Sequence, residues 1–179
     1  MVQIITRQAT IAQAGLSIGS QGTTAGSLAG GARWGSAGSG TRLSAALSWR
    51  QTDGYSARDA TVDPAANPDR DAGKQTAGSA LLEQSWAPGH RTQINLLSSR
   101  TRSAYDGYSP GLDDVLSTRT EVAGLQSRHA LAADTALTVQ LGQTREHFDD
   151  PTGFAAIGDN RVRLAGAQLS WQAAPEQEW

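Results

Sequence analysis

The sequence has 179 residues and no cysteine, which excludes a disulfide framework and a thiolate metal site. It has no apolar run near the roughly 20 residues that a membrane-spanning helix requires, so a helical membrane protein is excluded as well. It also lacks an excess of either charge, since 15 Lys and Arg stand against 17 Asp and Glu. A nucleic-acid-binding protein needs a basic face, so no nucleic acid is expected as a partner.

Catalytic motifs are also missing. No Gly-x-Ser-x-Gly elbow occurs, and Gly30-Gly31 is not followed by the Lys-Ser/Thr of a phosphate loop. His90, His129 and His147 are scattered without the spacing of metal ligands. The charged run 146–150 could be a metal or acid–base site, but a charged strand end is the simpler interpretation. We therefore expect no enzyme activity.

What the sequence does contain is alternation. Segments of about ten residues alternate apolar and polar side chains, which predicts strands with two different faces. In the clearest segment, Leu43, Leu47 and Trp49 face one way and Arg42 and Arg50 the other. The predicted strands are 2–8, 10–20, 24–34, 42–52, 76–86, 91–103, 118–129, one through 137–141, and 161–171.

The connections between these segments are alternately short and long. The long ones are 53–74, 104–115 and 148–159, and they join alternate pairs of strands. Short turns at one end and long loops at the other are typical of outer-membrane barrels. The predicted fold is an all-β, antiparallel, up-and-down transmembrane β-barrel, partial, with about eight strands after one short N-terminal strand. The last strand changes phase, and a β-bulge near Gly166 would reconcile its two halves.

Tryptophans and strand faces favour the membrane interpretation. Trp34, Trp86 and Trp171 fall at the short-turn ends of strands and Trp49 near the opposite end, as in the aromatic belts of membrane interfaces. A soluble barrel or sandwich that binds a small ligand inside would also alternate, and it stays open as an alternative. The face assigned away from lipid carries Arg42, Arg50, Arg91, Gln93, Asn95, Gln140 and Thr144.

Short motifs resemble one family. VQIITR at 2–7 is similar to the segment that leads from the plug into the barrel of TonB-dependent outer-membrane receptors. DGY at 53–55, SAYDGYSPG at 103–111 and STR at 117–119 resemble the cobalamin (vitamin B12) receptors of that family. The resemblance implies that residues 1–9 end a plug domain and that residues 10–179 form the N-terminal part of the barrel.

The resemblance also implies a location and a function. The parent protein would lie in the bacterial outer membrane, contact its lipid, and import cobalamin or a similar large chelate. It would meet TonB only through a plug region that this chain lacks. No signal peptide follows Met1, so a piece of a longer receptor is expected. The alternative is an autonomous eight-stranded outer-membrane barrel with a structural or adhesive role.

Aspartates are concentrated in the first two long loops, which hold eight of the twelve. Loops rich in carboxylates suit Ca²⁺, which takes six to eight oxygen ligands. The resemblance implies a calcium site, although Ser56 replaces one family aspartate. The alternative is solvated aspartates, neutralised in part by Arg58 and Arg70. Tyr55 and Tyr108 are candidates for substrate contact, or for loop packing. The implied metal ligands are Asp69, Asp71, the carbonyl of Tyr105, Asp106, and Asp113 or Asp114.

Overall fold

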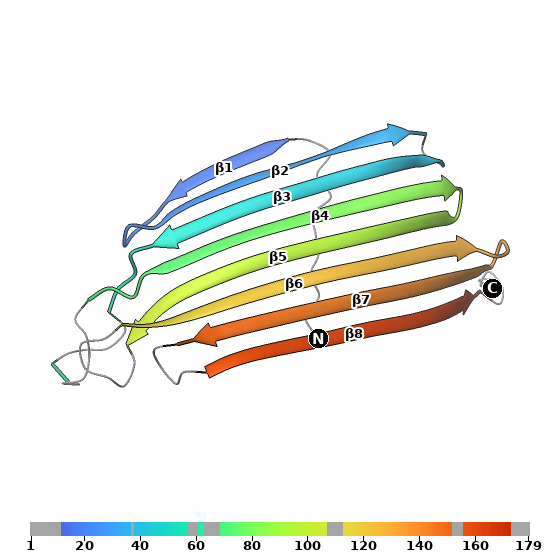
Figure 1. The fold of residues 1–179 in the computed structure, drawn as a ribbon. Helices are drawn as coiled ribbons and strands as arrows, with labels where there is room; N and C mark the ends of the chain where they lie inside the picture. Colours follow the sequence, from blue (N-terminus) through green and yellow to red (C-terminus); the bar gives the residue numbers. More distant parts are fainter. Residues whose placement is uncertain are drawn as a thin grey trace, which may run out of the picture.

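The computed structural model describes residues 12–36, 38–56, 61–62, 69–106, 113–151 and 156–172. These residues form one antiparallel sheet of eight strands in the order β1 to β8 (Figure 1). The strands are β1 Gln13–Ile18, β2 Thr24–Gly35, β3 Gly40–Thr52, β4 Gly73–Ala87, β5 His90–Asp106, β6 Asp113–Ala130, β7 Thr135–Asp150 and β8 Ala156–Trp171. The strand predicted at 2–8 and the plug segment at 1–9 lie outside the described residues.

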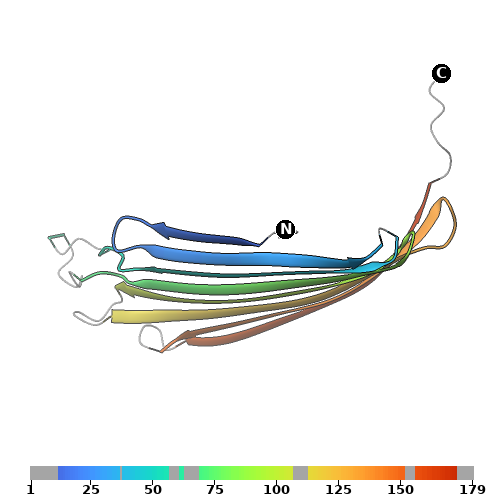
Figure 2. The same cartoon turned by 90° about the horizontal axis from the view of Figure 1, so that it is seen from above.

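The all-β, up-and-down prediction is confirmed, because each strand pairs with its neighbours in the chain. Figure 2 shows the sheet as a single curved layer. Within the described residues β1 and β8 do not pair with each other, so the sheet is open, with two free edges. None of the described residues forms a helix with the length and apolar character that crossing a bilayer demands.

The strands are longer than the alternation predicts, mainly in β5 to β8. Pairing continues to Asp106 and Asp113 between β5 and β6, and to Asp150 and Ala156 between β7 and β8. These ends are rich in aspartate, which favours turns locally. Their backbones nevertheless pair, because the ladder that precedes them already holds the two chains side by side. The second and third loops are therefore shorter than predicted.

The predicted bulge near Gly166 is wrong. The register between β7 and β8 runs without a shift from Thr135–Trp171 to Asp150–Ala156. In this edge strand the phase change is accommodated in a different way, since Val162 and Leu164 lie on the face opposite Leu169 and remain 54% and 62% exposed.

The described part of the sheet has almost no core. Leu81 and Ala136 are its buried hydrophobic residues, whereas more than twenty large apolar side chains are exposed. The accessible surface of 12754 Å² is about one and a half times the value typical of a compact monomer of this mass. In the described structure, no protein layer covers either face of the sheet.

Candidate membrane-facing surface and long-loop end

The two faces of the sheet differ in character. The apolar face is the one that carries Leu43 and Leu47 and their cross-strand neighbours. Its large side chains are open to solvent, with Leu16 86%, Leu47 63% and Leu169 64% exposed. The other face, here the polar face, carries every residue predicted to point away from lipid. The predicted division of the strands into two faces is confirmed.

Four tryptophans lie on the apolar face, near its two ends. Trp34, Trp86 and Trp171 lie beside the short turns, and Trp49 lies near the long-loop end of β3. The Trp86 Nε1–H donates to Thr92 Oγ1 at 3.1 Å. The Trp171 Nε1–H donates to Asp134 Oδ2 at 2.9 Å, in the turn before β7. Each of these two rings thus presents an apolar body and a satisfied polar edge.

At the long-loop end of the apolar face, the border between apolar and charged residues runs obliquely to the cross-strand rows. The last apolar residue on β3 is Trp49, and its cross-strand row contains charged residues on β5 to β8. On β8 the last residue of the band is Ala165, three rows closer to the short turns. The row of Trp49 continues through Thr76, Arg100, Arg119, His147 and Asp159.

The border at the short turns slants in the same direction. Trp34 on β2 lies opposite Thr41, whose row reaches Ala167 on β8. Trp171 lies two rows beyond that, farther toward the turns. Rows are about 6.7 Å apart and strands about 4.8 Å apart. The border at the long-loop end is therefore inclined to the rows by roughly 40°, and the border at the short turns by roughly 25°. The slope of the border at the long-loop end lies within the 35–45° strand tilt of outer-membrane barrels, and the border at the short turns is shallower.

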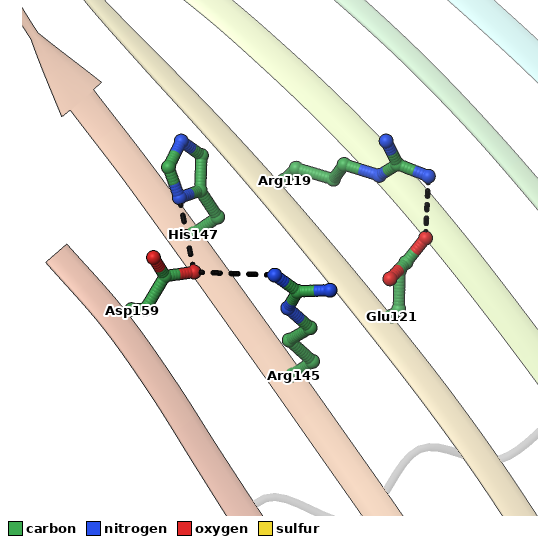
Figure 3. Close-up of polar contacts among 5 residues, drawn as sticks. All are labelled: Arg119, Glu121, Arg145, His147 and Asp159. Atoms are coloured by element: carbon green, nitrogen blue, oxygen red, sulfur yellow. Dashed lines mark hydrogen bonds and ion pairs between the residues drawn. The ribbon is translucent and has the colours of Figure 1, made fainter. Parts of the chain in front are cut away.

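On β5 to β8, a cluster of arginines lies directly beyond the border of the apolar band at the long-loop end. Figure 3 shows part of it, with Arg119 and Glu121 from β6, Arg145 and His147 from β7, and Asp159 from β8. The ion pair Arg119–Glu121 spans 2.5 Å, and Asp159 lies 3.6 Å from Arg145 and 3.1 Å from His147 Nδ1. The arginine patch comprises Arg100, Arg102, Arg119, Arg145, Arg161 and Arg163, all exposed.

At the long-loop end, the described ends of the two aspartate-rich connections adjoin each other. The Ala104 N–H donates to the carbonyl of Ala72 at 2.9 Å, so Asp71 and Tyr105 belong to adjoining segments. The Asp71 N–H in turn donates to the carbonyl of Tyr55 at 3.3 Å. Gly54 makes this closure possible, because its φ is +70° and a Cβ there would lie 1.9 Å from the Asp71 carbonyl oxygen.

Tyr105 lies beyond the apolar band and joins β5 to β7 across β6. Its hydroxyl donates to Asp150 Oδ2 at 2.6 Å. Asp114 is opposite Tyr105 in the ladder and is only 2% exposed. The hydrogen bond to Asp150, partial burial, and the negative charges of Asp150 and Asp114 together raise the pKa of Tyr105 to about 12. The family resemblance implies a role for the backbone carbonyl of Tyr105 as a metal ligand. The contact with Asp150 is made by its side chain and was not predicted.

The predicted calcium ligands are only partly brought together. Asp106 and Asp113 are ladder partners, and Asp114 faces Tyr105. In the described part of the chain, no three His, Asp or Glu side chains lie close enough to hold a metal ion. The side chain of Asp113 is outside the described residues.

The candidate substrate residues are placed unequally. Tyr55 lies just after β3 and is 65% exposed. Tyr108 lies outside the described residues. The charged run 146–150 does not form one cluster, because its side chains alternate between the two faces; His147 contacts Asp159 on one, and Asp150 contacts Tyr105 on the other.

Sequence reasoning missed a histidine pair at the short-turn end. His90 and His129 are ladder partners, with their Nδ1 atoms 3.2 Å apart. His129 Nε2 lies 2.8 Å from Ser127 Oγ, which lies 2.8 Å from Thr92 Oγ1. The arginine patch was missed as well. Its available signal was the spacing of Arg100 and Arg102, and of Arg161 and Arg163, at i and i+2.

Comparison with known proteins assigns this chain to no family. No protein-family model matches it, and no curated protein or solved structure matches it significantly. The likeness to TonB-dependent receptors therefore rests on the short sequence motifs alone.

Proposed function

We propose that this chain forms part of the membrane-spanning wall of a bacterial outer-membrane barrel, with the apolar face toward lipid. The observation that carries the proposal is the exposed apolar band with two oblique borders that slant in the same direction. A band of this kind is required where tilted strands cross a flat hydrocarbon layer. Tryptophans near both borders support the same orientation, since their rings favour membrane interfaces.

The free edges favour a segment of a larger barrel over an autonomous eight-stranded one. In lipid, an unpaired strand edge leaves backbone groups without hydrogen-bond partners, at a cost of several kcal/mol each. β1 is also much shorter than its neighbours, with six residues against 12 in β2. A soluble sandwich is less well supported, because the described residues include no second layer over the apolar face.

The finer proposal is a TonB-dependent receptor of the cobalamin type. It is supported by the motifs at 2–7, 53–55 and 103–111. In the intact parent these loops would form the outer mouth for cobalamin or a similar chelate. Bound Ca²⁺ would order them, with Asp69, Asp71, Asp106 and Asp113 or Asp114 as the carboxylates and Tyr105 supplying its carbonyl.

The membrane proposal is tested by the depth of the tryptophans. The full chain is folded into phosphatidylcholine vesicles that carry bromine at different positions along the acyl chains. We expect quenching by shallow bromines to depend mainly on Trp34, Trp49, Trp86 and Trp171, and single Trp→Phe variants assign the signal. Absence of quenching at every depth would reject the membrane orientation.

The receptor proposal is tested separately by flanking genomic sequence. A plug domain upstream of Met1 and further strands downstream would support the receptor. A signal peptide directly upstream would instead support the autonomous barrel.

A further inference from the structure

The arginine patch places like charges opposite one another on neighbouring strands. Arg100 is the ladder partner of Arg119, Arg145 of Arg161, and Lys74 of Arg102. Like charges directly opposite in a sheet repel and destabilise the pairing. Three such pairs lie on one face, at one end of the sheet, where an anion bound between them would offset the repulsion.

The protein itself supplies too few carboxylates. In the rows from Leu96 to Arg102, six arginines and Lys74 share the apolar face with Glu121, Asp149 and Asp159. Arg119 and Arg145 have ion-pair partners among these. Within the described residues, Arg100, Arg102 and Arg161 have no carboxylate within 4.0 Å. This excess of cations contrasts with a chain whose net charge is −2.

The position of the patch selects the kind of anion. The patch adjoins the apolar band, and farther out on the same face of β5, past Ala104, comes Asp106. The order along β5 is therefore apolar, cationic, then acidic. A soluble polyanion would not need an apolar surface beside its cationic site. A lipid has this order itself, with acyl chains followed directly by phosphate.

On the proposed membrane orientation, we propose that the arginine patch binds the phosphates of anionic lipid headgroups in the outer leaflet. Guanidinium groups hold phosphate oxygens in a bidentate fashion, and a row of them spaced by one strand can bridge neighbouring headgroups. Bound phosphates would lie between opposed arginines and convert their repulsion into attraction. The patch thus fixes the depth of β5 to β8 in the bilayer.

The test compares the full chain in vesicles of phosphatidylcholine alone and with added phosphatidic acid. The variant Arg100→Gln/Arg102→Gln/Arg161→Gln/Arg163→Gln leaves both ion pairs of the patch intact. The matched control is Arg33→Gln/Arg42→Gln/Arg91→Gln/Arg128→Gln, which removes the same charge, including two opposed pairs, from the polar face. Binding is measured by flotation, and insertion by protection from protease.

We expect the wild type to favour vesicles with phosphatidic acid by roughly tenfold or more, the patch variant to lose this preference, and the control to keep it. An Arg→Lys version of the patch variant should keep part of it, and inorganic phosphate should compete poorly. Insertion without lipid preference, or equal loss in variant and control, would overturn the lipid site. Equal competition by inorganic phosphate would also overturn it, in favour of a free-phosphate site. Failure of the wild type to insert into either vesicle would instead reject the membrane orientation.

Discussion

The apolar face of β1 to β4 differs from that of β5 to β8. On β3, apolar residues continue from Leu43 to Trp49, almost to the end of the strand. On β5 to β8 they occupy only the half near the short turns, and the other half is charged. The longer strands, of 16 to 18 residues, thus extend beyond the apolar band, whereas the shorter ones end close to it. Strand length alone does not determine the width of the band.

On the proposed membrane orientation, this difference follows from the geometry of a tilted strand. In a barrel, neighbouring strands are offset along their length, so a flat hydrocarbon layer would meet each strand at a different residue. The same row of the sheet could then hold Leu47 on β3 and Arg145 on β7 without contradiction. Residues in one row would have different surroundings, because the row itself would be inclined to the membrane plane.

The largest expected effect comes from placing an arginine within the band on β3. Leu47→Arg introduces the residue type that β7 and β8 already carry in the same row. If the band is oblique, the charge enters hydrocarbon, and the free energy of unfolding in phosphatidylcholine vesicles should fall by about 2–4 kcal/mol. Urea titration of the full chain in those vesicles measures the change.

Ser48→Arg is the matched control, since it adds the same charge one residue away on the polar face. Its cost should be within about 0.5 kcal/mol, as for most surface substitutions. Leu47 is 63% exposed in the sheet, so a water-exposed face would tolerate both variants equally. Equal tolerance would therefore remove the oblique membrane band.

A smaller effect is expected where β3 leads into the first long loop. Gly54→Ala forces a Cβ onto a residue with φ of +70° and against the Asp71 carbonyl. The left-handed conformation alone costs about 1–2 kcal/mol for a residue with a side chain, so urea unfolding should shift by at least that amount. Gly166→Ala is the control, because a Cβ at Gly166 meets nothing within 4 Å. A Gly54→Ala variant as stable as the control would contradict the described closure of the loop.

The strands and their faces could be predicted because alternation is a local signal. Leu43 to Trp49 shows its two faces within one strand, without knowledge of any partner. The charged half of β5 to β8 could not be predicted, since it depends on register. Only pairing reveals that Arg100 faces Arg119. The same holds for His90 and His129, which are far apart in the sequence and opposed in the sheet.

At the proposed calcium site, the placement of the residues could be predicted only in part, for a different reason. The motifs selected Asp106 and Asp113, and the ladder does pair them. No local pattern indicated that Tyr105 would engage Asp150, because that contact crosses an intervening strand. The strands were also predicted to end too early, because aspartate favours turns locally. At Asp106 and Asp150, long-range pairing overrides that preference for turns.

The next prediction concerns Tyr105, beyond the band at the end of β5. Its raised pKa of about 12 means that the folded state favours the protonated phenol. This contribution to stability is complete below the ordinary tyrosine pKa of about 10 and is lost as pH rises toward 12. Asp150→Asn removes the hydrogen-bonding carboxylate, so the pKa of Tyr105 should fall toward its ordinary value. Absorbance of tyrosinate measures it, with Asp159→Asn as the control that should leave it unchanged.

The smallest expected effect is a change in the pKa of Asp134. It compares Trp171 and Trp34, which lie at the two ends of the border at the short turns. Trp171 on β8 is anchored to Asp134, whereas the Trp34 ring on β2 makes no hydrogen bond within the described residues. The Thr135 hydroxyl, followed by the Trp171 indole, lowers the pKa of Asp134. A lowered pKa means that the ionised carboxylate is favoured on folding. Its contribution is present above the ordinary aspartate pKa and is lost as pH falls.

Thr135→Val should therefore raise the pKa of Asp134 the most, Trp171→Phe should raise it less, and Trp34→Phe should leave it unchanged. Carbon-13 NMR of the labelled Asp134 carboxyl follows each titration. If Trp171→Phe left the pKa unchanged while Thr135→Val raised it, the indole would contribute nothing. On the proposed membrane orientation, lipid contact alone would then hold the border at both β8 and β2, and the two halves of the sheet would differ only at their charged end.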